Sequence, residues 1–494
     1  MALLCAASGL IQGCKQEPAE KKPNIIFILA DDMGYGDLHS LNPGSKIPTP
    51  NMDRLVGEGV HFTDVHSNSA VSTPTRYGII TGRYAFRTKL KNGVLWGYSP
   101  SLIDHGRGTI ASFLKNNGYS TACIGKWHLG LDWAKKDNKR EIPDIADADK
   151  IGIGFDDNVD YSKAVRGGPS DNGFEYSFII PASLDMTPYC YIRNGNVVEA
   201  PTAYTKGTNE KSDGRGVFWR AGNVSPGFDF FKVLPTFVDS AYKFILNHTG
   251  KKEPFFLYLA LPSPHTPWLP SVEFHGSSKA GRYGDYVVMV DAMIGKIVKA
   301  VEEENIDENT LIIVTSDNGS DWRPSDIDEF DHRANYIFKG RKADIYEAGH
   351  RIPFIARWYG VIPAGTKSDE IMCTTDLMAT LAGMLNKPLP ENAGEDSYNM
   401  WPAFTGKALS SPVREVIVHH SVNGYFSIRK GRWKFTPHLG SGGFSVPVKI
   451  EPVAGEAPGT LYDIENDPGE TVNLYNQYPD IVSELTGLLE KYRN

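Results

Sequence analysis

A short segment around residue 72 combines a hydroxyl side chain with an arginine at helical spacing. Ser72 precedes Pro74, and proline is favoured in the first turn of a helix. Ser72 would then lie at a helix N-terminus, where free backbone N–H groups and the helix dipole favour anions. Arg76 follows four residues later and falls on the same helical face. The pattern predicts an anion site beside a potential nucleophile, and a capped helix with an exposed arginine is the alternative.

Side chains with oxygen donors follow two apolar runs of the sequence. Asp31 and Asp32 come directly after the first run, and Asp317 and Asn318 follow another in the same way. Ligands collect at the carboxyl ends of strands in open parallel sheets. An all-oxygen set suits Ca²⁺ or Mg²⁺ better than zinc. Asp and Asn also make ordinary turns after strands, but the two clusters together favour a metal.

Cations and histidines that could serve an anionic substrate occur in three further segments. Lys126 and His128 are two residues apart after a strand-like run, so they point the same way on an extended chain. His265 and Lys342 also lie next to apolar runs. A lysine could hold an anion and a histidine could move a proton. Taken singly, each of these residue types is more often found on the surface.

These segments resemble the signatures of the formylglycine-dependent sulfatases, a family of the alkaline phosphatase superfamily. Its first signature, Cys or Ser, any residue, Pro, any residue, Arg and later Thr-Gly, is filled by residues 72–76 and 81–82. The second, Gly-Lys-x-His-x-Gly, is filled by residues 125–130. Ala348 stands where a second glycine is more usual. The resemblance covers nearly all of the chain after residue 22, through further similar stretches at residues 23–34, 317–319, 346–354 and 461–470.

The resemblance implies a role for each of these residues. The calcium ligands would be Asp31, Asp32, Asp317, Asn318 and the side chain of Ser72. The residues that hold the sulfate would be Arg76, Lys126, His265 and Lys342. His265 would protonate the departing sugar oxygen, a role that Lys342 could share. His128 would be the base that expels sulfate.

Ser72 itself would have to be oxidised to formylglycine, because a serine that attacked a sulfate ester would become a stable sulfoserine. The hydrate of an aldehyde offers one hydroxyl as nucleophile, and the sulfated hemiacetal collapses when a base deprotonates the other. The resemblance implies an anaerobic sulfatase-maturating enzyme that accepts serine, and hence an anaerobic bacterium. Two alternatives stay open: Ser72 is an engineered replacement of a native cysteine, or the protein is a natural one that is never converted.

The activity that the resemblance implies is hydrolysis of a sulfated carbohydrate of mucin or glycosaminoglycan type. A faint similarity at residues 183–186 points to galactose or N-acetylgalactosamine sulfate. One rival is a phosphodiesterase or phosphonate hydrolase of the same superfamily. Two-metal phosphatases usually need extra His and Asp ligands, whereas this sequence offers ligands for one metal and three cationic side chains, a combination that suits sulfate. The other rival is an unconverted protein that only binds sulfated glycans.

A sugar pocket needs aromatic platforms and polar side chains near the sulfate. Trp322 and Arg323 follow the predicted metal ligands closely, so we expect them to bind the sugar. Weaker candidates for the same role are Asp185, His332, Arg333 and Asn335.

The elements that must position these residues alternate along the chain. Apolar runs predict buried strands at residues 24–30, 254–261, 310–315 and 352–357. Apolar residues at three- and four-residue spacing predict helices at residues 109–117, 236–247, 286–304 and 375–385. The alternation predicts an α/β fold with a large mixed, mostly parallel sheet sandwiched between helices. Short runs at residues 416–420 and 425–428, and a closing helix at residues 481–492, predict a smaller antiparallel sheet with one helix.

Three segments are predicted from these changes in pattern. Residues 23–409 would form the catalytic domain and residues 410–494 a C-terminal α+β subdomain. Residues 1–22 are typical of an export or lipoprotein signal with a linker, in which Cys14 would be lipidated. This interpretation predicts a periplasmic or outer-membrane-anchored protein of a Gram-negative anaerobe, and a mis-assigned start is the alternative.

Composition narrows the class of partner. The chain has 494 residues, of which 41% are hydrophobic and 22% charged, as in soluble globular proteins. Its formal net charge of −8 argues against non-specific nucleic-acid binding. An anionic substrate must therefore be attracted by a local group of cations. Five cysteines, two of them within the first 14 residues, do not make a disulfide framework.

Overall fold

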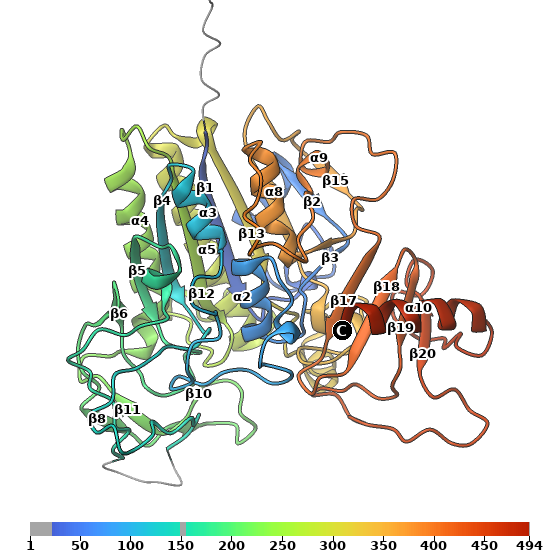
Figure 1. Ribbon diagram of the computed structural model, residues 1–494, viewed down its shortest axis with the longest axis horizontal. Helices are drawn as coiled ribbons and strands as arrows, with labels where there is room; N and C mark the ends of the chain where they lie inside the picture. The colour runs from blue at the N-terminus through green and yellow to red at the C-terminus, as the bar shows by residue number, and fades with distance from the viewer. Residues whose placement is uncertain (1–21, 149–154, 494) are drawn as a thin grey trace, which may run out of the picture.

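The computed structural model describes residues 22–148 and 155–493 and contains a ten-stranded sheet (Figure 1). In spatial order its strands are β15 (Thr366–Ser368), β2 (Val60–Phe62), β14 (Phe354–Arg357), β13 (Thr310–Ser316), β1 (Asn24–Asp31), β12 (Phe255–Pro264), β4 (Ser120–Lys126), β5 (Tyr176–Ile180), β6 (Ile192–Arg193) and β7 (Asn196–Val197). The five strands from β13 to β5 run parallel to one another. β14 is antiparallel to β13 and β2, and β6 is antiparallel to β5 and β7. The predicted mixed, mostly parallel sheet is confirmed.

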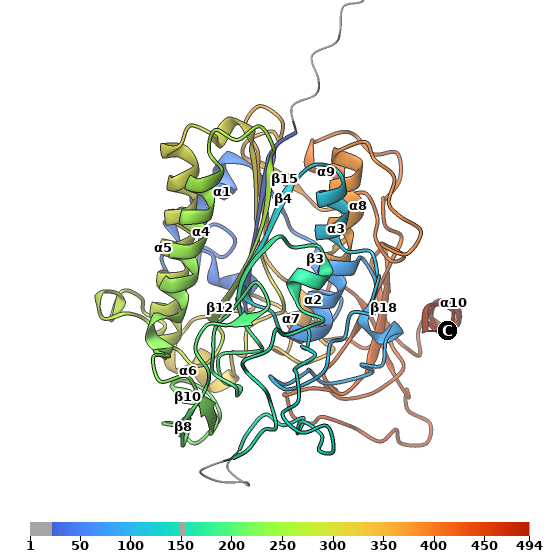
Figure 2. The same ribbon diagram turned by 60° about the vertical axis from the view of Figure 1, so that its left-hand side comes forward.

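Both faces of this sheet are covered by helices (Figure 2). Along β1, alternate side chains enter two separate apolar cores, with Phe27 in one and Ile28 in the other. The first core is shared with helices α2 (Ser72–Thr81), α3 (Ile110–Asn116) and α8 (Leu377–Met384). The second is shared with helices α1 (Pro50–Glu58), α4 (Val233–His248) and α5 (Gly281–Glu303). Since β1 is apolar on both faces, its sequence reads as one continuous run.

The predicted helices are present with small changes in their ends. α5 begins at Gly281, five residues before the predicted start, because its first turn contains glycines and an arginine that hide the apolar spacing. Between β7 and α4 the chain also forms two small antiparallel pairs that were not predicted: β8 (Ala203–Thr205) with β11 (Gly222–Val224), and β9 (Thr208–Asn209) with β10 (Phe218–Trp219). Strands of two or three residues are too short to show a period of two.

A second, four-stranded antiparallel sheet follows near the C-terminus (Figure 1). Its strands are β17 (Val416–His420), β18 (Phe426–Lys430), β19 (Trp433–Thr436) and β20 (Thr460–Asp463). Leu485 and Leu489 of helix α10 (Pro479–Arg493) pack on it, together with Tyr84 and Phe86 from the segment after α2. The predicted small sheet with one helix is therefore confirmed, whereas the domain bounds 23–409 and 410–494 remain a prediction.

Backbone contacts close to Ser72 join the C-terminal sheet to the segment that precedes α2. Ser69 forms an isolated parallel bridge with His420 of β17, and the N–H of Ala70 donates to the His420 carbonyl at 3.0 Å. The last strands of the chain therefore help to fix the segment that leads into α2. Cys14, the predicted lipid anchor, lies outside the described residues. Within the described ranges, no helix is both long and apolar enough to cross a membrane.

Candidate active site

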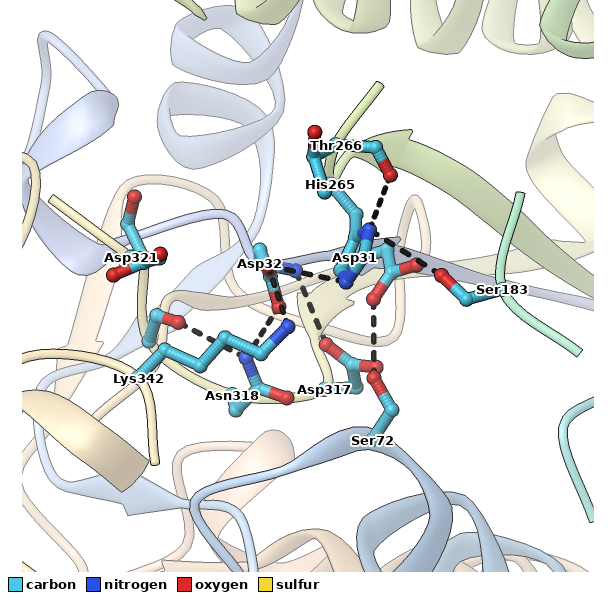
Figure 3. Close-up of polar contacts among 12 residues, drawn as sticks. Asp31, Asp32, Ser72, Ser183, His265, Thr266, Asp317, Asn318, Asp321 and Lys342 are labelled. Atoms are coloured by element: carbon cyan, nitrogen blue, oxygen red, sulfur yellow. Dashed lines mark hydrogen bonds and ion pairs between the residues drawn. The ribbon is translucent and has the colours of Figure 1, made fainter. Parts of the chain in front are cut away.

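The carboxyl ends of four parallel strands bring the predicted polar residues to one edge of the sheet (Figure 3). Asp31 is the last residue of β1 and Lys126 the last of β4. His265 follows β12, and Asp317 and Asn318 follow β13. All five side chains are buried. Parallel neighbours end at the same edge, which is why residues far apart in sequence meet there.

Ser72 is the first residue of α2 and faces this edge. Its hydroxyl donates to Asp31 Oδ1 at 3.2 Å, and Lys126 Nζ donates to Ser72 Oγ at 3.2 Å and to Asp31 Oδ2 at 2.6 Å. Burial opposes ionisation of Asp31, but Lys126 and His265 outweigh it and hold the pKa of this carboxyl well below its usual range. The predicted nucleophile therefore lies between a carboxylate and an ammonium group.

Arg76 is completely buried, which excludes the exposed-arginine alternative. Its Nε and Nη2 donate to Asp317 Oδ2 at 3.1 and 2.8 Å, and its Nη1 donates to the Lys126 carbonyl at 3.2 Å. Burial disfavours the charged form, yet Asp317 and Asp31 raise the pKa of the guanidinium above its ordinary value. Arg76 thus ties α2 to the ends of β4 and β13.

Asp32 connects the remaining residues of the site. Its Oδ2 accepts from Lys342 Nζ at 2.7 Å, and its Oδ1 accepts from Asn318 Nδ2 at 2.7 Å. His265 Nε2 lies 3.7 Å from Asp32 Oδ2. Burial opposes the charge on Lys342, but Asp32 and Asp31 outweigh it and raise the pKa of the ammonium group. Asp32 also has a φ of 65°, in the left-handed region that Asp adopts more readily than most residues with a side chain.

His128 has the geometry of a neutral base. Its Nε2 lies 2.7 Å from the Leu95 carbonyl, so this nitrogen must carry the proton. Its Nδ1 is buried and has no hydrogen-bond partner within the described part of the chain. Burial, with Lys126 and Arg76, holds the pKa of His128 well below its ordinary value. The ring is therefore neutral, with a free lone pair on Nδ1.

The glycines that flank His128 are required by close backbone contacts. Gly125 has a φ of 116°, and a Cβ there would lie 1.8 Å from the Ala260 carbonyl oxygen. Gly130 has a φ of 77°, and a Cβ would lie 2.1 Å from the Pro100 carbonyl oxygen. Any side chain would push β4 away from β12 or displace the following loop. This explains the spacing of the Gly-Lys-x-His-x-Gly run.

The donor set fits a hard cation. Asn318 Oδ1 is buried and has no hydrogen-bond partner among residues 22–148 and 155–493, although its Nδ2 is bonded. An unpaired buried carbonyl is costly unless a ligand satisfies it. Asp31 and Asp32 each offer an oxygen within 4.8 Å of the other and of a His265 nitrogen. Amide and carboxylate oxygens converging in this way are ligands that Ca²⁺ prefers.

A cavity of about 500 Å³ opens over this edge of the sheet. From the predicted site it is lined by Asp32, Ser72, His128, His265 and Lys342. Further lining residues are Trp96, Asp185, Met186, Arg215, Arg220, Trp268, Asp321 and Phe444. Arg76 and Lys126, which were expected to hold the sulfate, are completely buried behind the lining, where Arg76 contacts Asp317 and Lys126 contacts Asp31 and Ser72. The sequence reasoning missed Trp96, Arg215, Arg220 and Phe444, because loops from separate parts of the chain bring them here.

Trp322 and Arg323 are not positioned to bind a sugar, contrary to the expectation. Trp322 is 3% exposed and packs on Tyr283, and its indole N–H donates to the His332 carbonyl at 2.8 Å. Arg323 pairs with Asp213 at 3.1 Å. Neither lines the cavity, because the chain turns the large apolar ring into the core and the guanidinium toward an acidic loop.

Three of the four weaker sugar candidates also lie away from the cavity lining. His332 is buried against Asp37 at 2.9 Å, Asn335 hydrogen-bonds the backbone of Ser320, and Arg333 is exposed.

Asp185, the fourth weaker candidate, does line the cavity. Its carboxylate is held by Arg220, whose guanidinium lies over the ring of Phe218 at 4.9 Å. Burial opposes ionisation, but Arg220 and His265 outweigh it and lower the pKa of Asp185 to about 2. Its Oδ1 is buried without a partner among the described residues. The cavity wall therefore offers a charged hydrogen-bond acceptor to a ligand.

Comparisons with known proteins agree with this geometry. A family model described as Sulfatase matches residues 23–387.

This chain belongs to the sulfatase family. An N-acetylgalactosamine-6-O-sulfatase of Bacteroides thetaiotaomicron is 33% identical to it, over 98% of this chain and 97% of that protein. Human steryl-sulfatase is 30% identical over 92% of this chain and 84% of its own length. A structure from work on the metabolism of multiple glycosaminoglycans by Bacteroides thetaiotaomicron has a TM-score of 0.80 and 32% identity, covering 96% of this chain and 100% of that one. The sulfatase is thus a sulfuric ester hydrolase, as predicted.

Proposed function

We propose that this sulfatase removes sulfate from a sulfated carbohydrate of mucin or glycosaminoglycan type, with a formylglycine made from Ser72 and with Ca²⁺. The observation that carries the proposal is the position of Ser72 Oγ, 3.2 Å from both Asp31 Oδ1 and Lys126 Nζ at the floor of the cavity. A nucleophile there meets a sulfate among cationic side chains. The 33% identity to an N-acetylgalactosamine-6-O-sulfatase supports a galactose or N-acetylgalactosamine sulfate as substrate.

Ca²⁺ would be held by Asp31, Asp32, Asp317, Asn318 and the side chain of residue 72. The unpaired Asn318 Oδ1 supports this assignment. When bound, the ion would lower the pKa of a coordinated hydroxyl and neutralise charge on the sulfate oxygens.

The cationic side chains would hold the sulfate. Lys342 lies in the lining of the cavity, and its raised pKa keeps it charged. Lys126 contacts Ser72 directly, and Arg76 fixes Asp317 behind it. Preorganised cations of this kind stabilise the negative charge that develops in an in-line transfer of a sulfuryl group.

Two histidines would move the protons. His265 is fixed by a hydrogen bond from Nδ1 to the Thr266 carbonyl at 2.5 Å, which leaves Nε2 facing Asp32 and the cavity. In its doubly protonated form, which carries a proton on Nε2, it can protonate the departing sugar oxygen, a role that Lys342 could share. His128 Nδ1 carries a free lone pair at the cavity, so His128 can accept the proton whose removal expels sulfate.

The oxidation of Ser72 requires an anaerobic sulfatase-maturating enzyme as a partner. Mass spectrometry of the peptide that spans residue 72, taken from the protein of the native host, tests this step. Conversion lowers the mass of serine by about two units, the loss of two hydrogens. If the serine is intact and the protein also fails to release sulfate, the remaining interpretation is a protein that only binds sulfated glycans.

Measurement of sulfate release tests both the class of substrate and the requirement for Ca²⁺. We expect turnover of a sulfated galactose or N-acetylgalactosamine and none of the phosphorylated analogue. A chelator should abolish turnover, and Ca²⁺ should restore both activity and melting temperature, since a ligand at about 100 times its Kd stabilises the folded state by about 2.7 kcal/mol. Faster hydrolysis of a phosphodiester would instead favour the phosphodiesterase rival.

Export to the periplasm, with an outer-membrane anchor on Cys14, completes the proposal. The support is the sequence of residues 1–22 alone. Metabolic labelling with a fatty acid tests it: label should be retained by the wild type and lost in Cys14→Ser.

A further inference from the structure

Phe444 is a large apolar side chain that remains exposed in the lining of the active-site cavity. It is 43% exposed, whereas Ser72 in the same cavity is 3% exposed. Ser72 therefore marks the floor and Phe444 the rim. Phe444 lies in the loop between β19 and β20, so the C-terminal sheet contributes it. An exposed aromatic ring at the mouth of a binding cavity is suited to pack against a ligand.

The loop that carries Phe444 is firmly attached to the main domain. Asp344 Oδ1 accepts from the backbone N–H of Phe444 at 2.8 Å and of Ser445 at 2.9 Å. Gly443 lies against the Ala343 carbonyl, where a Cβ would come within 2.3 Å of the oxygen. These contacts fix the loop to the residues directly after Lys342. The rim therefore has a defined position relative to the sulfate-binding floor.

One face of the Phe444 ring is covered by an arginine. The guanidinium carbon of Arg341 lies 5.5 Å from the ring centroid, and its Nη2 donates to the Phe444 carbonyl at 2.6 Å. Arg341 is held in turn by an ion pair with Asp321, which also lines the cavity. The ring is thus oriented before a ligand arrives, which reduces the entropy cost of binding.

We infer that Phe444 stacks on the sugar ring next to the sulfated one, so that the sulfatase prefers a sulfated oligosaccharide to a sulfated monosaccharide. This rests on the proposed function, because it assumes that a sulfated sugar occupies the floor. A sugar on the floor directs its glycosidic neighbour toward the rim, and the apolar face of a pyranose packs on an aromatic ring. The C-terminal sheet therefore takes part in substrate selection.

The experiment compares kcat/KM for a sulfated monosaccharide and for a disaccharide that carries the same sulfated residue. In Phe444→Ala we expect the preference for the disaccharide to fall about tenfold, which corresponds to about 1.4 kcal/mol, mainly through KM. The rate on the monosaccharide should be unchanged. Phe444→Tyr should retain the preference, and Phe444→Leu, which keeps apolar volume without a flat ring, should lose it.

Val446 supplies the matched control, since it is 87% exposed, lies two residues away and is not part of the cavity lining. Val446→Ala should leave both substrates unaffected. An unchanged preference in Phe444→Ala, or an equal loss on both substrates, would overturn the inference. A wild-type protein that releases sulfate from neither substrate would instead refute the proposed function.

Discussion

Two buried groups of charged residues differ in whether they open to the active-site cavity. The active-site cluster consists of Asp31, Asp32, Arg76, Lys126, Asp317 and Lys342. The histidine cluster consists of Asp64, His66, Glu347, His350, Arg351, His419, Arg429, Lys434 and Glu470. The first opens to a cavity, whose lining includes Asp32 and Lys342. No member of the second lines that cavity.

The histidine cluster joins the C-terminal sheet to the main domain. Asp64 pairs with Arg351 at 2.6 Å and with Arg429 of β18 at 2.7 Å. Lys434 of β19 lies between Glu347 at 3.1 Å and Glu470 at 3.0 Å. Two of these pairs, Asp64–Arg429 and Glu347–Lys434, connect the main domain to the C-terminal sheet. The buried charges of the histidine cluster therefore stabilise an interface, whereas those of the active-site cluster belong to the proposed reaction centre.

The proximity of histidines alone would place the metal site in the histidine cluster. His66, His350 and His419 offer nitrogens within 4.8 Å of one another, the spacing of a possible ion site. However, the rings of His350 and His419 stack at 3.8 Å with planes 10° apart, so their in-plane lone pairs run side by side and do not converge. Lys434 Nζ also lies 3.2 Å from His350 Nε2, where it repels a cation. The direction of the donor atoms, more than their proximity, therefore distinguishes the two clusters as candidate metal sites.

The largest expected effect is on the chemistry of the active-site cluster. Ser72→Ala removes the group that becomes the nucleophile, and we expect sulfate release to fall by about 10³-fold or more. The melting temperature should change little, because only one hydroxyl is lost. Sulfate release and thermal unfolding measured on the same sample check both parts, and residual activity above about one per cent would contradict the assignment.

The matching change in the histidine cluster should affect stability. Asp64→Ala leaves Arg429 without its carboxylate and removes one of the two that pair with Arg351, and breaking such a buried pair costs about 3–5 kcal/mol of unfolding free energy. Folded protein at low temperature should retain its kcat. Denaturant unfolding measures the loss, with Lys296→Ala as control, since the exposed Lys296–Asp239 pair is worth about 1 kcal/mol or less. Equal losses in both variants would refute the interpretation.

A smaller effect is expected at the cavity wall. Asp185→Asn weakens the acceptor offered to a sugar hydroxyl, and we expect kcat/KM on a sulfated sugar to fall about 10- to 100-fold, the effect of about 1.4–2.7 kcal/mol in a charged hydrogen bond. Hydrolysis of an aryl sulfate, whose leaving group has no such hydroxyl, should be nearly unchanged. A similar loss on both substrates would show that Asp185 acts on the sulfate end.

The smallest effect is the contribution of a single histidine to the pH dependence of stability in the histidine cluster. Burial, the largest cause, holds the pKa values of His66, His350 and His419 below the ordinary value in the folded protein. The unfolded chain therefore binds protons first, so stability is full above about pH 6.5 and is lost as the pH falls, by up to about 1.4 kcal/mol per unit for each histidine. Melting temperatures from about pH 8 to about pH 5.5 check this. His419→Gln should flatten the slope, and an equal slope in both proteins would contradict the prediction.

Residues at strand ends could be predicted because short-range pattern determines them. Asp31 and Asp317 follow apolar runs, and a parallel sheet necessarily brings such positions together. Lys126 and His128 were recognisable from their spacing after a strand-like run, but β4 ends at Lys126 and His128 has a φ of 57°, so the expected extended chain between them was wrong. Local sequence was sufficient wherever one strand or one turn sets the position.

Residues of the cavity wall could not be predicted in the same way. Trp322 was expected to bind sugar from its closeness to Asn318 in sequence, but its large apolar ring is more stable packed on Tyr283. Phe444 is held at the cavity by Asp344, 100 residues earlier, which accepts its backbone N–H, and by Arg341, which donates to its carbonyl. The positions of such residues depend on contacts between distant segments, and neither hydrophobic periodicity nor a local motif predicts these contacts.

The backbone contact between Ala70 and His420 has a consequence for the order of events during synthesis. Ser72 is translated early, whereas the strand that fixes its approach is made some 350 residues later. At a synthesis rate of about 5–20 residues per second, this leaves an interval of about 20–70 s in which the serine exists without its final surroundings. Ser72 is therefore among the first residues of the active site to be made, and its surroundings are among the last to be completed.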